Sequence, residues 1–212
     1  MNKMYKLYKL IKKEIFKSKK TYLLLSIIML LGFIFGTLFI TILNNTDKSL
    51  IVKSITNFFN NIKESNINTI GILKNSLLSN ILFIVLIFIL SISIIGIPFI
   101  IIICFYKSFI LGFSISSIIL TYKLSGSLLA LVYIFPHVII YLFLMLYVSL
   151  YGIFISLSMY KVIFSKKEIN LKLYIKRFIL ICIICILISI LLSLFEAFVT
   201  PYLLSNFKFL IK

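Results

Sequence analysis

The sequence predicts an all-α membrane protein, a polytopic bundle of about five transmembrane helices. Of its 212 residues 62% are hydrophobic and only 13% are charged, whereas a soluble domain is about half apolar and a quarter charged. The apolar residues also gather into runs long enough to cross a bilayer, which takes roughly 20 helical residues. Lipid must therefore cover most of the surface of this chain.

The five predicted spans are separated by polar or proline-containing breaks. Gly96-Ile97-Pro98 divides an apolar stretch that is too long for one helix, because proline cannot donate a helix hydrogen bond and glycine tolerates the turn. Pro136 precedes His137 near the start of the fourth run, where we expect a kinked or interfacial first turn. The chain thus forms one integral membrane domain, 1–212, with spans at about 22–43, 77–95, 98–122, 128–160 and 178–204.

The net charge of +17 reflects membrane topology rather than nucleic-acid binding. The basic residues cluster between the apolar runs, as the positive-inside rule describes, and are not spread over one folded surface. Eight lysines lie in residues 1–20, and six basic residues lie in residues 161–177. Five spans place 14 basic residues in the cytoplasm and seven outside, with Lys107 inside a span. The N-terminus is therefore predicted to be cytoplasmic and the C-terminus outside.

Two polar segments have the spacing of amphipathic helices. Residues 1–20 are predicted to lie on the anionic cytoplasmic leaflet. Residues 44–76 form the only sizeable outer segment. Its apolar face either rests on lipid or binds a partner, and its members are the partner-binding candidates Ile51, Ile55, Phe58, Phe59 and Ile62.

Small residues mark the predicted helix contacts. Gly32 and Gly36 form a G-x-x-x-G in the first span, a spacing that lets two helices approach closely. Gly112 in the third span is a further helix-packing candidate. The pattern does not distinguish a contact within one chain from a contact between copies, so a homo-oligomer stays open.

Three ionisable side chains fall inside or beside the apolar runs, where each is costly. Lys107 lies near mid-membrane and Glu196 in the outer third of the last span. Lys107 either lines an ion, proton or substrate pathway or has a structural role, in which it pairs with a carbonyl group or Glu196 or snorkels to the membrane interface. His137 has no Asp, Glu or Cys near it in sequence, so we expect it to bond a backbone group beside Pro136.

No residue pattern indicates catalysis, a metal or a cofactor. The spans contain one His and no Asp, and the sequence lacks a Walker motif, a serine nucleophile elbow and a paired-carboxylate site. Cys182 and Cys185 form a C-x-x-C inside an apolar helix, where thiols pack rather than react. The residues therefore predict a non-enzymatic protein.

The order of these features resembles the stage II sporulation protein M family over nearly the whole chain. The resemblance starts with the basic N-terminus and the G-x-x-x-G span and ends at Phe135-Pro136-His137. Its most specific part is residues 93–113, from Ser93 through Gly96-Ile97-Pro98 and Lys107-Ser108-Phe109 to Gly112-Phe113. The chain departs from the family at Ser108, often glycine there, and at Val138 and Tyr141, where many relatives carry glycine and glutamate.

The resemblance implies a scaffold of the engulfment machinery in endospore-forming bacteria. In that family the protein lies in the mother-cell membrane at the septum. It holds two peptidoglycan hydrolases, the stage II proteins D and P, during septal wall remodelling. The alternative is a transport component, either a small permease or the membrane subunit of an ATP-driven exporter. Lys107, Glu196 and the broken helix at Gly96–Pro98 favour that alternative.

Overall fold

The computed structural model describes residues 19–63, 68–134, 137–165 and 171–206, and within them every regular element is helical. The predicted all-α fold is therefore confirmed, although the N-terminal amphipathic helix lies outside the described residues. The elements are α2 (Lys19–Ile42), α3 (Asn45–Lys63), α4 (Thr69–Ser91), α5 (Gly96–Ile134), α6 (Val138–Ser165), α7 (Leu171–Leu194), the π-helical turn η1 (Phe195–Val199) and α8 (Thr200–Asn206).

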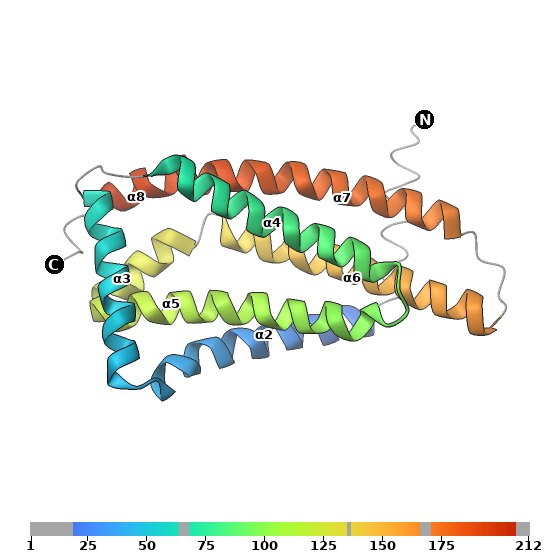
Figure 1. Cartoon of the computed structure of the whole chain (residues 1–212), viewed down its shortest axis with the longest axis horizontal. Coiled ribbons are helices and arrows are strands. Elements are labelled where there is room, and N and C mark those ends of the chain that lie inside the picture. The colour runs from blue at the N-terminus through green and yellow to red at the C-terminus, as the bar shows by residue number, and fades with distance from the viewer. Residues whose placement is uncertain (1–18, 64–67, 135–136, 166–170, 207–212) are drawn as a thin grey trace.

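Five helices of the described chain are long and apolar enough to cross a membrane, as predicted. Their directions alternate, so α2 begins at one end of the bundle and α8 lies at the other, beside α3 (Figure 1). The second span begins at Thr69, well before residue 77, because Asn68 caps the helix. The Asn68 side-chain oxygen accepts a hydrogen bond from the Gly71 backbone N–H at 2.9 Å.

The spans pack in two groups that α6 joins (Figure 1). Helices α2 and α5 run side by side, and α4 and α7 cover the opposite side of α6. The core lies where α4, α5, α6 and α7 meet, with Tyr151 stacked on Phe178 at 5.7 Å between ring centroids. Cys182 and Cys185 are buried in this core as free thiols, which agrees with their predicted packing role.

The G-x-x-x-G of α2 makes a contact within the chain. A Cβ on Gly32 would lie 2.5 Å from the Phe105 carbonyl oxygen, and one on Gly36 would lie 2.9 Å from the Phe109 carbonyl carbon. A Cβ on Gly112 of α5 would likewise collide with the backbone of α2. The three glycines therefore let two parallel helices touch backbone to backbone.

The break at Gly96–Pro98 is also present. Helix α4 ends at Ser91 and α5 begins at Gly96, whose Cβ position is filled by the Leu90 carbonyl oxygen. Pro98 lies in the first turn of α5, where its missing N–H costs no helix hydrogen bond. Ser156 of α6 donates a hydrogen bond to the Ser93 carbonyl oxygen at 2.6 Å, so a neighbouring helix satisfies part of the turn.

The expected span at 128–160 is wrong in its first part. Helix α5 breaks at Lys123, which has φ 51° and ψ −126°, and the chain turns back as a short helical segment that ends at Ile134 (yellow in Figure 1). The fourth span then begins only at Val138. The backbone around Gly126 packs on that of Ile118 and so fixes this segment against α5. Pro136 lies outside the described residues.

Helix α3 lies across one end of the bundle (Figure 1), and its apolar face packs on α5 and α8. Phe59 is fully buried, and its ring meets the Tyr122 ring edge-on at 5.3 Å. Ile51, Ile55 and Phe58 are half-buried on the same side, and the Ile62 side chain is outside the described set. The prediction of an amphipathic helix is confirmed, but Phe59 as an exposed partner contact is wrong because α5 and α8 cover it.

Candidate functional site

A polar cavity of about 300 Å³ opens between α4, α5, α6 and the α7–η1 junction. It contains all three ionisable residues that stood out in the sequence, although they come from segments far apart along the chain. Its polar lining residues are Asn75, Ser76, Ser79, Asn80, Lys107, Ser114, His137, Tyr141 and Glu196.

Lys107 enters the cavity from α5 and is anchored to α4. Its ammonium nitrogen lies 2.5 Å from the Ser79 hydroxyl oxygen and 3.3 Å from the Ser79 carbonyl oxygen. This geometry agrees with the structural alternative for Lys107, in which the lysine pairs with a carbonyl group. Glu196 lines the same cavity, but the hydrogen bonds of Lys107 go to Ser79.

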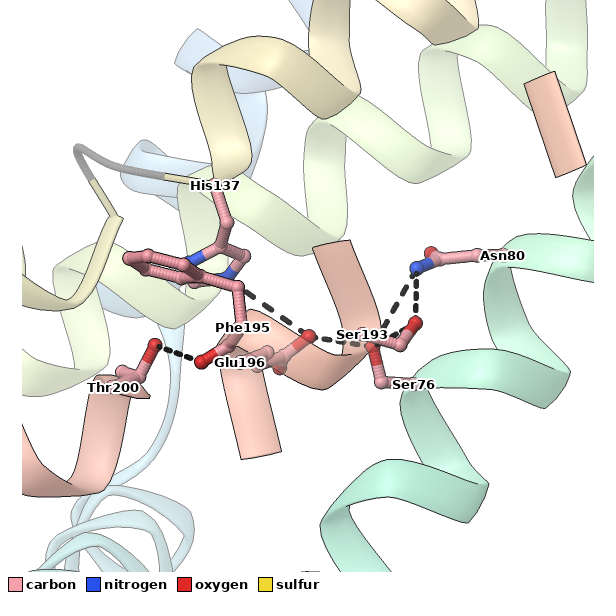
Figure 2. Close-up of polar contacts among 7 residues, drawn as sticks. All are labelled: Ser76, Asn80, His137, Ser193, Phe195, Glu196 and Thr200. Carbon is pink, nitrogen blue, oxygen red and sulfur yellow. Dashed lines mark hydrogen bonds and ion pairs between the residues drawn. The ribbon is translucent and has the colours of Figure 1, made fainter. Parts of the chain in front are cut away.

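Glu196 enters the cavity from the π-helical turn η1, and Figure 2 shows it between Ser76 and His137. Ser76 of α4 donates a hydrogen bond to Glu196 Oε2 at 2.6 Å. The Ser76 hydroxyl also lies 3.0 Å from Ser193 Oγ, and the Asn80 amide donates to Ser193 at 3.2 Å. A π-turn adds one residue to the helix and so changes which side chains face a neighbour. Here it occurs at the carboxylate.

His137 faces Glu196, a partner that its sequence neighbours did not indicate. Its Nε2 lies 3.9 Å from Glu196 Oε2, and its ring is 6.4 Å from the Phe195 ring (Figure 2). Residue 137 immediately precedes α6, so the start of that helix aims the imidazole at the last span. His137 therefore has a carboxylate near it in space, although none is near it in sequence.

Tyr141 lies one turn after His137 and is only 8% exposed. It lines the cavity, and its hydroxyl has no hydrogen-bond partner among the described residues. The family resemblance placed a glutamate at this position in many relatives. In this chain Tyr141 provides a hydroxyl there, and Glu196 brings a carboxylate to the same cavity from another helix.

The arrangement differs from a serine hydrolase site. In a catalytic triad the imidazole lies between the nucleophile and the carboxylate, whereas here Glu196 lies between Ser76 and His137. The described residues also contain no group of three His, Cys, Asp or Glu side chains that could hold a metal. The cavity geometry suits binding of a polar molecule better than nucleophilic chemistry.

Sequence reasoning found the charged members of the site and missed the uncharged ones. Ser76, Ser79 and Asn80 share a face of α4 by helical spacing. That signal was hidden because residues up to 76 were assigned to the outer segment. A polar stripe at intervals of three and four residues within an apolar helix would have revealed it.

Comparisons with known proteins give one result. No curated protein matches the chain, and no solved structure does. The family model described as stage II sporulation protein M matches residues 25–201, from the first span to α8. The match includes the α2–α5 glycine contact, the Gly96 turn and the polar cavity. The chain therefore belongs to the stage II sporulation protein M family.

Proposed function

We propose that this chain is a non-enzymatic membrane scaffold of the engulfment machinery. In this role it holds peptidoglycan hydrolases, the stage II sporulation proteins D and P, at the septal membrane of the mother cell. The family match over residues 25–201 is the observation that supports the proposal. The order of Ser76, Glu196 and His137, which differs from a triad, is consistent with a role without catalysis.

Helix α3 is the proposed docking surface. The hydrolases act on cell wall, so their catalytic domains lie outside the membrane, and we place the α3 end of the bundle there by the positive-inside rule. Because the apolar side of α3 packs on its own chain, a partner would meet the opposite side. That side is polar and exposed, with Lys53, Asn57, Asn60 and Asn61 along it.

The double change Lys53→Glu with Asn60→Glu tests this surface. Both side chains are exposed, so the fold should be kept, while the reversed charge at residue 53 and the added negative charge at residue 60 should weaken a complementary partner contact. We expect about tenfold less hydrolase to co-purify from sporulating cells. Lys161→Glu, an exposed lysine at the far end of α6, is the matched control and should change nothing. Undiminished recovery with the double variant would assign recruitment to the spans.

The proposed orientation is tested by cysteine labelling. Asn60→Cys on α3 and Lys161→Cys near the end of α6 lie at opposite ends of the bundle (Figure 1). A membrane-impermeant thiol reagent applied to intact cells should label residue 60 and leave residue 161 unlabelled until the cells are opened. The native thiols at 104, 182 and 185 are buried, so background labelling should be low. The reverse pattern would contradict an outer α3.

A transport role is the second candidate, and the polar cavity favours it. Transport sites are built from buried polar side chains at interrupted helices, and here Lys107, Glu196 and the π-turn η1 meet at one cavity. Solute or proton flux through purified protein in vesicles would support transport. Hydrolase recovery that depends on α3, without flux, would support the scaffold.

A further inference from the structure

Two side chains of opposite charge line the cavity, and the serines that hold them lie about one helical turn apart on α4. Lys107 is anchored at Ser79, and Glu196 is anchored at Ser76. These two serines are three residues apart on α4, which corresponds to about 4.5 Å along the helix axis. The two charged groups thus lie at neighbouring levels of the same cavity, within roughly 300 Å³ of space.

Unused hydrogen-bonding capacity lies beside this space. The Tyr141 hydroxyl is buried and has no partner among the described residues, and leaving such a group unsatisfied is costly. The Lys107 ammonium has three protons, and Ser79 accepts two hydrogen bonds from it. A molecule bound here could therefore accept from both Lys107 and Tyr141.

We propose that the cavity binds a small zwitterion, a molecule that carries an acidic group and an ammonium a few bonds apart. The acidic group accepts hydrogen bonds from Lys107 and Tyr141, and the ammonium faces Glu196. Besides His137, which lies beside Glu196, the cavity is lined by one cation, Lys107, and one carboxylate, Glu196. A ligand with both charges is therefore matched at each end, whereas a simple anion or cation is matched at one end only. This inference does not depend on the scaffold role.

The same chemistry has two sources, a phosphatidylethanolamine headgroup or a free compound such as phosphoethanolamine. The experiment uses the full chain in nanodiscs of phosphatidylglycerol, with free phosphoethanolamine added, and in nanodiscs that contain phosphatidylethanolamine. Binding is followed by calorimetry and by the thermal unfolding midpoint. A response to the free compound assigns a soluble ligand, and a response only to the lipid assigns a headgroup. Inorganic phosphate or ethanolamine alone should bind at least about tenfold more weakly.

Two variants decide whether the cavity is responsible. Lys107→Met should abolish the response. Tyr141→Phe removes only a hydroxyl that has no partner in the described part of the chain, so the unliganded protein should stay as stable or become more stable while its affinity falls several-fold. Ser127→Ala is the control, because this exposed hydroxyl bonds within its own helical segment. No response to either source, or an equal response in Tyr141→Phe, would overturn the proposal.

Discussion

Replacing Gly36 by leucine is expected to prevent α2 from packing on α5 and to destabilise the fold strongly. A Cβ at this position would lie 2.9 Å from the Phe109 carbonyl carbon and 3.0 Å from the Phe113 backbone nitrogen. Backbone atoms cannot rotate away, so the whole helix must shift. We expect a loss at or above the upper end of the about 1–3 kcal/mol range for overpacking, measured as folded yield and unfolding midpoint in detergent.

Gly71→Leu is the matched control for this change. The three atoms nearest to a Cβ at Gly71 all belong to the Asn68 side chain, at 3.0 Å or more, and a side chain can move. Gly36→Ala adds a further check, because the clash involves the Cβ itself and even alanine should be destabilising. A folded but monomeric Gly36→Leu protein from an oligomeric parent would instead assign the glycines to contacts between copies.

The spans could be predicted because they depend on local composition. An apolar run of about 20 residues needs no tertiary information to be assigned as a transmembrane helix, and the five spans follow from such runs. The Gly96 turn was equally local, since the Gly-Ile-Pro sequence itself interrupts a helix. The glycine spacing also predicted close packing, but the partner helix could not be predicted without the fold.

The break at Lys123 lies where the expected spans at 98–122 and 128–160 leave a gap, but the fold-back of the segment after it could not be predicted, because its cause is tertiary. Lysine rarely adopts positive φ, and nothing in the local sequence requires it there. The conformation persists because the segment after it packs back on α5 near Gly126 and under α3. An apolar sequence from residue 128 onward looks the same whether it crosses the membrane or turns back within the protein.

Only the ionisable residues of the candidate site could be identified from the sequence. Lys107, His137 and Glu196 stood out because an ionisable group in an apolar run is costly. Their convergence on one cavity depends on the rotation of each helix about its axis and, at Glu196, on the π-turn. The hydroxyls of Ser76 and Tyr141 gave no signal, since serine and tyrosine are ordinary residues in membrane helices.

Replacing Phe59 by serine is expected to detach α3 from the bundle. The phenyl ring is fully buried and packs edge-on against Tyr122 at 5.3 Å, with Leu129, Ala130 and Leu204 completing the cluster. Removal of a buried phenylalanine side chain costs about 3–5 kcal/mol, and a buried serine hydroxyl without a partner adds to this. The unfolding midpoint should therefore fall sharply, and a cysteine placed at Ile118, under α3, should become reactive to thiol reagents.

Phe58→Ser is the comparison variant for Phe59→Ser, because it removes a phenyl ring from the same helix with a smaller loss of packing. Phe58 is only half-buried on the same helix, so its loss should be smaller, and the spans should remain inserted in both variants. The joint replacement of Phe58 and Phe59 cannot test partner recruitment by itself, because reduced hydrolase recovery would follow from loss of α3 as readily as from loss of a contact. Unchanged stability and an unreactive Ile118→Cys in the Phe59→Ser background would show that α3 rests on lipid. The face toward α5 would then again be open to a partner.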